Sequence, residues 1–251
     1  MTDLTDGTPP YADAIQAPGT DEGVWETWPG WESLPEFTLP PPGRVVVVAA
    51  HPDDEVLGLG GTIARLAAAG HGLTVVSVTD GEGSHPHSRV LRPHDLSRVR
   101  AEEIRTALDR LGAPDAEIAR LHVPDSGVGR HEEEVRRALV PLCSGAALVA
   151  APWTADVHSD HEAAGRAARA AAAESGVPFV EYPVWLWHWG RPEDPRVPLG
   201  PGRTAPPVRG GPGPETARRR CLRLADPAPG PRAGGSGRPA SRGARPPPAT
   251  P

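Results

Sequence analysis

The chain has 251 residues, enough for one domain with a sizeable hydrophobic core. Its net charge of −6 combines a basic segment over residues 200–251 with an acidic body, and the acidic body argues against nucleic acid as the substrate. No apolar run approaches the roughly 18 residues of a membrane span. The two cysteines, Cys143 and Cys221, form neither a metal-binding spacing nor a disulfide framework, and the first residues lack the basic and apolar regions of a signal peptide. We therefore expect a soluble, cytoplasmic protein.

Residues 1–42 are expected to form an acidic N-terminal extension that is rich in Pro and carries several Trp residues. Trp25, Trp28 and Trp31 repeat at a spacing of three. These side chains are open to three interpretations: packing on the domain, lining the rim of a binding site, or contacting a partner. We favour packing, because large aromatic side chains contribute mainly through the area that they bury.

The first predicted strand, residues 44–50, ends directly at a cluster of charged side chains. Short apolar runs rich in β-branched residues are typical of buried strands in a parallel sheet. The strand is followed by the charged residues 51–55, by the Gly-rich residues 58–61 and by a predicted helix over 61–69. The cluster is thus predicted to lie on a strand-to-helix turn, where open α/β sheets bind their ligands.

The chemistry of this cluster indicates a metal site. His51 and Asp54 are three residues apart and can share one face of a turn, and an imidazole with a carboxylate is a ligand pair for zinc or iron. Asp53 lies between them as a candidate general base for water. Glu55 is placed to hydrogen-bond the backbone or a ligand, and we include it among the candidate substrate contacts. Acids that merely favour a helix N-terminus would not account for the histidine.

A second predicted strand, residues 73–79, leads into a long loop over residues 84–93. A loop at this end of the sheet would overhang the charged turn, so it is a candidate substrate loop. We select Arg92 as its candidate substrate contact, although no motif singles this residue out. The histidines of the loop are interpreted as exposed side chains.

The chain then alternates between amphipathic helices and short strands. Asp125 follows the third strand as either a substrate contact or a turn residue. The predicted helices span residues 95–111, 131–142 and 160–174, and the strands span 118–123, 146–151 and 179–184. This order predicts an α/β fold with a doubly wound, mostly parallel sheet of about five strands and helices on both faces.

The fourth strand ends at a second cluster, His158-Ser159-Asp160-His161. His161 would complete a set of two histidines and one aspartate, which leaves a coordination position open as catalytic sites do. His158 is then available as an acid or to stabilise an oxyanion, with Asp160 orienting it. Alone, this segment could equally be a helix N-cap with incidental histidines. The first cluster favours the metal interpretation.

The motif Ala-His-Pro-Asp-Asp-Glu at residues 50–55, followed by His-Ser-Asp-His at residues 158–161, resembles the PIG-L/LmbE-like family of zinc-dependent deacetylases. The resemblance implies a Rossmann-like fold over about residues 43–198 and hydrolysis of an N-acetyl group on a small N-acetylglucosamine-type sugar or conjugate. It implies that the metal ligands are His51, Asp54 and His161.

The same resemblance implies that Asp53 is the general base and His158 the acid or oxyanion stabiliser. Zinc is the expected metal, although ferrous iron suits the same ligands. Some members of the family carry a Tyr at the position that Asp156 occupies in this chain.

Two C-terminal segments complete the sequence. Residues 185–189 hold three tryptophans around His188, which fits either an aromatic wall near the site or burial of a sheet edge. Residues 199–251 are rich in Pro, Gly and Arg, a composition that predicts disorder. We hypothesise that this tail reflects a shifted reading frame; the alternative is a natural basic tail that contacts an acidic partner.

Three other functions were weighed. The chain could be a family member that binds metal but is catalytically weak, or a metal hydrolase acting on another amide or on an ester. A nucleotide-binding module is disfavoured, because the glycine fingerprint that begins at Gly58 has Ile63 where its third glycine should stand, and the acidic turn would repel a pyrophosphate.

Overall fold

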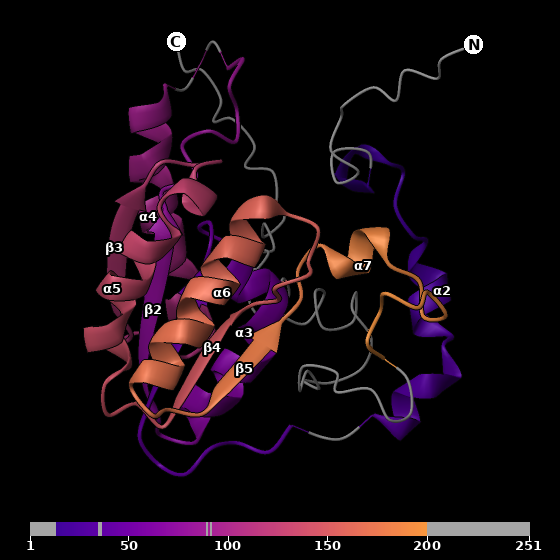
Figure 1. The fold of residues 1–251 in the computed structure, drawn as a ribbon, viewed down its shortest axis with the longest axis horizontal. Helices are drawn as coiled ribbons and strands as arrows, with labels where there is room; N and C mark the ends of the chain where they lie inside the picture. Colours follow the sequence, from indigo (N-terminus) through magenta and orange to yellow (C-terminus); the bar gives the residue numbers. More distant parts are fainter. Residues whose placement is uncertain (1–13, 35–36, 89, 91, 200–251) are drawn as a thin grey trace, which may run out of the picture.

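The computed structural model describes residues 14–34, 37–88, 90 and 92–199, and Figure 1 shows a central sheet covered by helices. The prediction for the C-terminal tail therefore falls, except for Leu199, outside the described residues. Among the helices described, none combines the length and the apolar character needed to cross a membrane.

The predicted parallel sheet is confirmed. Its five strands lie in the order β3-β2-β1-β4-β5, and every pair of neighbours is parallel. The strands are β1 (Arg44–Ala49), β2 (Gly72–Thr79), β3 (Glu117–Val123), β4 (Leu148–Pro152) and β5 (Phe179–Tyr182). Both faces of the central strands are covered, which explains why β1 and β4 are apolar along almost their whole length.

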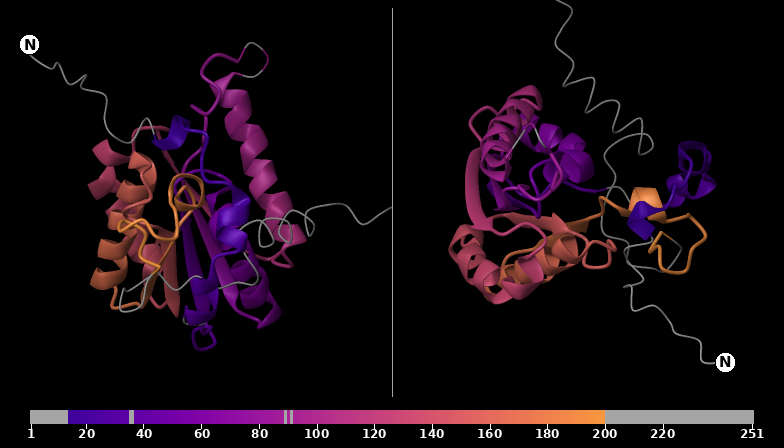
Figure 2. Two further views of the ribbon diagram at one scale, coloured as in Figure 1. Left: turned by 90° about the vertical axis from the view of Figure 1, so that its right-hand side faces the viewer. Right: turned by 90° about the horizontal axis from the view of Figure 1, so that it is seen from above.

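Two helices cover each face of the sheet (Figure 2). Helices α3 (Asp54–Ala68) and α4 (Pro93–Arg110) pack on one face, and α5 (Glu132–Cys143) and α6 (Ser159–Glu174) pack on the other. The alanines of α6 allow it to approach the sheet closely. Gly165 lies so close to the sheet that a Cβ there would be 2.3 Å from the carbonyl oxygen of Pro152.

The prediction for the start of α3 was wrong. The helix begins at Asp54 and not near residue 61, so the Gly-rich segment lies inside it rather than in a turn. Gly58 is needed for packing, since a Cβ there would lie 2.3 Å from Cδ2 of Tyr182. The hydroxyl of Tyr182 donates a hydrogen bond to Val48 O at 2.6 Å, which ties β5 to β1 across this contact.

The N-terminal segment packs against the segment that follows β5. The short helices α2 (Glu22–Glu26) and α7 (Leu186–Trp189) lie beside each other in Figure 1, and Trp31 of η1 (Pro29–Ser33) packs on Trp187 with ring centroids 6.1 Å apart. Trp25 is 1% exposed, and its Nε1 donates a hydrogen bond to Trp187 O at 3.0 Å. Trp28 and Trp31 pack against the same apolar cluster, so the packing interpretation of the three N-terminal tryptophans is confirmed.

Candidate active site

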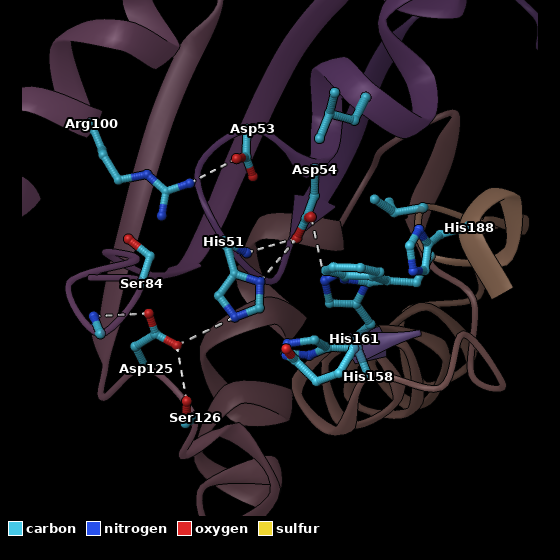
Figure 3. A pocket seen from close by; sticks show the side chains of 15 residues that line it. His51, Asp53, Asp54, Ser84, Arg100, Asp125, Ser126, His158, His161 and His188 are labelled. Carbon is cyan, nitrogen blue, oxygen red and sulfur yellow. Dashed lines mark hydrogen bonds and ion pairs between the residues drawn. The ribbon is translucent and has the colours of Figure 1, made fainter. Parts of the chain in front are cut away.

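The two charged clusters meet at the carboxyl ends of β1 and β4, where the strand order reverses (Figure 3). His51 and Asp54 belong to the turn between β1 and α3, whereas His158 and His161 lie at the start of α6. All four line a cavity of about 580 Å³, a size that suits a small-molecule ligand.

The turn after β1 is held by its own carboxylates. The backbone N–H of His51 donates to Asp54 Oδ2 at 2.8 Å, and the backbone N–H of Asp53 donates to Glu55 Oε2 at 3.1 Å. Asp53 has a φ of 119°, outside the range that most L-residues adopt. A strained residue held by neighbouring contacts is typical of functional sites, and here it directs the Asp53 side chain into the cavity.

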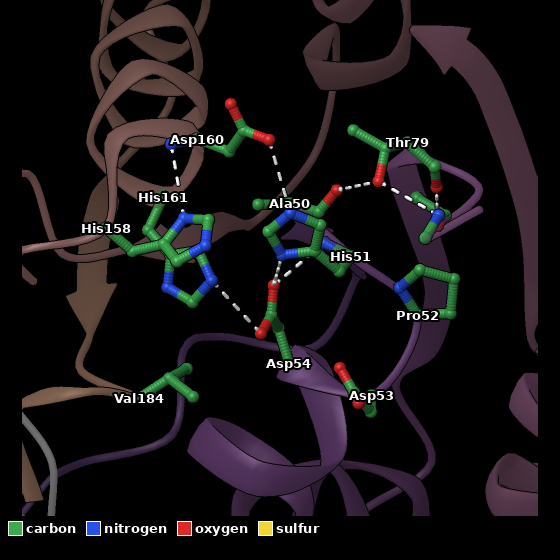
Figure 4. Close-up of polar contacts among 12 residues, drawn as sticks. Ala50, His51, Pro52, Asp53, Asp54, Thr79, His158, Asp160, His161 and Val184 are labelled. Carbon is green, nitrogen blue, oxygen red and sulfur yellow. Dashed lines mark hydrogen bonds and ion pairs between the residues drawn. The ribbon is translucent and has the colours of Figure 1, made fainter. Parts of the chain in front are cut away.

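Asp54 lies between the two histidines that were predicted as its fellow ligands (Figure 4). Its Oδ2 is 3.5 Å from His51 Nδ1, and its Oδ1 is 3.3 Å from His161 Nε2. Burial alone would raise the pKa of Asp54, but the facing imidazoles lower it well below its usual range. Asp54 is therefore an ionised carboxylate with an imidazole on either side.

The two ring nitrogens of His161 have different surroundings. Its Nδ1 contacts Asp156 Oδ2 at 2.9 Å, whereas its Nε2 is buried without a hydrogen-bond partner among the described residues. In a neutral histidine whose Nδ1–H is held by a carboxylate, Nε2 is unprotonated, which is the form that binds metals. The chemistry of the donors around this nitrogen thus fits a divalent cation.

Two sets of potential ligand atoms each lie within 4.8 Å of one another in the described residues. One consists of His51, His158 and His161, and the other of His51, Asp125 and Asp160. Asp54 belongs to neither set, although its two oxygens lie 3.5 Å from His51 Nδ1 and 3.3 Å from His161 Nε2. His51 is common to both sets and therefore lies between them.

Asp53 points to the opposite side of the turn from Asp54. Its Oδ2 accepts a hydrogen bond from Arg100 at 2.8 Å, and Arg100 also donates to the carbonyl oxygens of Pro52 and Gly81. Burial, reinforced by the charge of Asp54, raises the pKa of Asp53 to about 6, even though Arg100 acts in the opposite direction. A carboxylate with a pKa near neutrality suits a general base.

His158 stands beside both other imidazoles. Its ring centroid is 4.6 Å from that of His161 and 4.9 Å from that of His51, and it stacks on Trp185 at 6.2 Å. Burial and the two neighbouring imidazoles lower the pKa of His158 to about 4. Its Nδ1 accepts from the backbone N–H of Asp160 at 3.3 Å, so the neutral ring carries its proton on Nε2.

Asp160 does not orient His158 through its carboxylate, and that prediction is corrected. Its Oδ2 accepts from the backbone N–H of Ser126 at 2.8 Å, and its Oδ1 accepts from that of Val128 at 3.1 Å. Oδ2 also lies 3.3 Å from His51 Nε2. The first turn of α6 directs this side chain toward η2 (Val128–Arg130), so Asp160 positions His51 and the loop before η2.

Of the three candidate substrate contacts, only Asp125 lines the cavity. Its Oδ1 is 3.5 Å from His51 Nε2, and its Oδ2 accepts from the backbone N–H of Gly83 at 3.0 Å. Glu55 is fully buried beneath the turn, because it lies inside the first turn of α3 and bonds the turn's backbone. The prediction that it contacts substrate is corrected to a role in holding that turn.

Arg92 is exposed and does not line the cavity. It is the N-cap residue directly before α4, so it lies at the N-terminal end of that helix. Arg100, eight residues further along α4, reaches the turn after β1 instead. The contact of Arg100 with Asp53 and the role of Asp156 in holding His161 were not predicted from the sequence. A spacing of two helical turns from the loop could have drawn attention to Arg100, whereas Asp156 stood out only as the residue found where some members of the family carry a Tyr.

A family model described as "GlcNAc-PI de-N-acetylase", PIG-L, matches residues 46–172, which is half of the chain. A "1D-myo-inositol 2-acetamido-2-deoxy-alpha-D-glucopyranoside deacetylase" of Kineococcus radiotolerans is 41% identical over 80 residues, 31% of this chain and 22% of that protein. A "Diacetylchitobiose deacetylase" of Thermococcus kodakarensis is 30% identical over 142 residues, 54% of this chain and 51% of that protein.

Among solved structures, the N,N'-diacetylchitobiose deacetylase of Pyrococcus horikoshii is similar to this chain with a TM-score of 0.49 and 27% identity, over 55% of this chain and 60% of that one. The matches to the two curated relatives thus span between about a fifth and half of their length. With both motifs inside the matched residues, the chain belongs to the PIG-L family.

Proposed function

We propose that this protein is a metal-dependent hydrolase that removes the N-acetyl group from a small N-acetylglucosamine-type sugar or conjugate in the cytoplasm. The observation that carries the proposal is the open Nε2 of His161, which faces the ionised Asp54 while Nδ1 is held by Asp156. The names of the curated relatives, which are deacetylases of acetylated amino sugars, support the choice of substrate class.

His51, Asp54 and His161 are the residues that would hold the cation, and Zn²⁺ and Fe²⁺ both suit two imidazoles and one carboxylate. Such a cation supplies Lewis acidity that polarises an amide carbonyl and makes water more acidic. His51 is kept in place by Asp160 on one side and by its own backbone bond to Asp54 on the other.

Asp53 is the proton acceptor in this mechanism. As water attacks the acetyl carbonyl carbon, the carboxylate of Asp53 takes up the proton that the water loses. When the C–N bond breaks, the amine nitrogen needs a proton, and a group with a pKa of about 6 can return the one it has just accepted. Acetate and the free amine leave. The ion pair with Arg100 holds the Asp53 carboxylate at a fixed place during both transfers.

His158 stabilises the oxyanion that forms at the carbonyl. Its lowered pKa keeps the ring neutral at pH 7, so it acts through the Nε2–H group and not through a positive charge. A neutral imidazole that donates a hydrogen bond is sufficient for this role. This role for His158 would serve the oxyanion in a chain that has Asp156 where some members of the family carry a Tyr.

The test is to measure metal content by elemental analysis and amine release from N-acetylglucosamine and N,N'-diacetylchitobiose, in the native chain and in His161→Ala. We expect one equivalent of metal and amine release in the native chain, and loss of both in the variant. His94→Ala, whose side chain is 84% exposed, is the matched control and should keep both.

Each alternative predicts a different result. Metal without turnover of any amide or ester would favour a catalytically weak binding protein, and faster hydrolysis of an ester than of the acetamido sugars would favour another metal hydrolase. A folded native chain that binds no metal would overturn the proposal.

A further inference from the structure

A second cavity shares the Asp53–Arg100 ion pair with the active-site cavity. It has a volume of about 270 Å³ and lies between the first turn of α3 and one face of α4. Asp53, Leu57 and Arg100 line both cavities, whereas the three histidines of the active site line only the first. The second cavity is therefore separate from the proposed metal ligands but adjacent to the proposed general base.

The walls of this second cavity are mainly apolar. Val56 and Leu57 contribute from α3, and Ile104 and Ala107 contribute from α4. Leu57 and Glu103 are exposed, so the cavity opens to solvent beside them. An apolar cavity of roughly 150 Å³ is large enough for a molecule the size of benzene. The second cavity can therefore hold a compact hydrocarbon ring.

One buried polar atom of the cavity wall has no partner. Glu55 lines the cavity and is 0% exposed, and its Oε2 accepts a hydrogen bond from the backbone N–H of Asp53 at 3.1 Å. Its Oε1 is buried without a hydrogen-bond partner among the described residues. Because an unpaired buried oxygen is costly, a ligand that donates a hydrogen bond to Oε1 would both gain a bond and remove that cost.

The charges around the cavity favour a cation. Carboxylates from three residues line it, Asp53, Glu55 and Glu103. The guanidinium of Arg100 donates to Asp53 Oδ2 at 2.8 Å and to two backbone carbonyl oxygens (Figure 3). The positive charge of Arg100 is thus taken up by Asp53. The carboxylates of Glu55 and Glu103 remain, and no other cationic side chain lines the cavity.

These walls and charges exclude several classes of ligand. A carboxylate or a phosphate would be repelled by the remaining carboxylates. The proposed product, an amino sugar, carries hydroxyl groups that would stay unpaired against the apolar walls. A primary ammonium ion on a compact hydrocarbon fits both features, because its nitrogen is positively charged and donates hydrogen bonds while its carbon atoms match the walls.

We propose that the cavity between α3 and α4 binds a small primary ammonium ion whose nitrogen donates to Glu55 Oε1 and whose hydrocarbon body packs on Ile104 and Ala107. Such a ligand would contact both Glu55 and Arg100, the residues that hold the backbone and the carboxylate of Asp53. The proposal goes beyond the proposed function and does not depend on it, because it concerns binding in a separate cavity.

Calorimetry with three compounds of similar shape tests the chemistry of the site. Cyclohexylammonium should bind the native chain with a dissociation constant on the order of 1 mM. Cyclohexanol, which lacks the charge, should bind about tenfold more weakly, and cyclohexanecarboxylate should not bind. Equal or tighter binding of the alcohol or of the carboxylate would overturn the proposal.

Two substitutions on α4 test the place of binding. Ala107→Phe puts a ring into the cavity and should reduce the affinity for cyclohexylammonium by at least about tenfold. Thr106→Phe adds the same ring at the neighbouring, exposed position, which does not line the cavity, and should keep the native affinity. Equal affinities in the two variants would overturn the proposal, because the cation would then bind elsewhere.

Glu55→Gln tests the hydrogen bond itself. The amide keeps the size of the side chain but removes its charge, so the affinity for cyclohexylammonium should fall about tenfold while that for cyclohexanol changes little. Circular dichroism checks the fold, since Glu55 also holds the turn after β1. Glu103→Gln, at an exposed position, is a second variant with an expected loss of about threefold. Native affinity for the cation in either folded variant would contradict the site.

Discussion

The active-site cavity has an inner side, formed by the charged and imidazole side chains that follow β1 and β4, and an outer wall, formed by residues 184–190 and the N-terminal segment packed on them. The two sides are held in place by different kinds of contact. On the inner side, charged and imidazole side chains fix one another, as Asp54 does between His51 and His161. On the outer wall, backbone hydrogen bonds and tryptophan packing fix the segments, as in the contact between Trp25 and the backbone of Trp187. A change on the inner side therefore alters reactivity directly, whereas a change on the outer wall alters shape.

The largest effect is expected on the inner side, from Asp53→Asn. An amide cannot accept the proton, so kcat should fall by about 10² to 10⁴, the usual contribution of a general base. Metal content should stay at the native value, because Asp53 faces Arg100 and not the imidazole pair. Elemental analysis and initial rates on one preparation check both points; loss of the metal would show that Asp53 is itself a ligand.

Asp156 contacts both His161 on the inner side and the backbone of Trp185 on the outer wall. We expect Asp156→Asn to have a smaller effect than Asp53→Asn. The amide cannot hold His161 Nδ1 as the carboxylate does, so metal affinity should fall about 10- to 100-fold. The tryptophan signal in near-ultraviolet circular dichroism should change as well, because the same carboxylate holds the backbone of Trp185.

Competition with a metal-binding dye measures the affinity of this variant. Asp194→Asn is the control, since Asp194 pairs with Arg196 in the outer region without touching the metal ligands. If Asp156→Asn changed only one of the two readouts, the idea of a link between the sides would be wrong.

Arg100→Lys should have a moderate effect, with kcat/KM about tenfold lower. A lysine keeps the charge but cannot reach Asp53 and the carbonyls of Pro52 and Gly81 at once, so the general base loses its fixed orientation. Steady-state kinetics measure the change. Arg92→Lys is the matched control, because Arg92 is exposed at the outer end of the same helix, and an equal loss in both variants would argue against a special role for Arg100.

The smallest effect is expected from Asp80→Asn, in an ionic network one strand away from the catalytic cluster. Burial alone would raise the pKa of Asp80, but hydrogen bonds from His122, Arg120 and Ser97 lower it. The native carboxylate thus contributes stability that is present above its unfolded pKa, roughly 3.9, and that is lost as pH falls through the lower native pKa.

Urea unfolding should show Asp80→Asn to be about 1 kcal/mol less stable than the native chain at pH 7, a difference that shrinks as the pH is lowered below about 4. A difference that does not depend on pH would show that packing and not ionisation is involved. Catalysis should change little, which would separate general ionic stabilisation from the charged contacts of the inner side.

The sequence predicted which residues come together at the site better than it predicted the direction of their side chains. The convergence of His51, Asp54 and His161 was predictable, because residues at the carboxyl ends of neighbouring parallel strands meet at one edge of the sheet. The side to which a residue points within a helical turn was not predictable. Glu55 and Asp160 each lie next to a proposed ligand, yet they face the supporting backbone.

Errors of helix position had a similar cause. The glycines after the first motif are usually a turn signal, but close packing against Tyr182 places Gly58 inside α3. Arg92 was predicted as a substrate contact because it lies in the loop after β2. The loop gives way to α4 at Pro93, and it is Arg100, within that helix, that reaches Asp53. The contact of residues 14–20 with His188 joins segments too distant in the chain for any local pattern to indicate it.

The way in which Asp156 holds the outer wall has a consequence for how this protein can diverge. The carboxylate binds three successive backbone N–H groups, at residues 184–186, and makes no demand on the side chains that these residues carry. Val184 and Leu186 are buried, but a substitution of the partly exposed Trp185 would leave its backbone hydrogen bond to Asp156 in place. The outer wall can therefore change the side chain that residue 185 presents to the cavity while the anchor that also holds His161 stays in place.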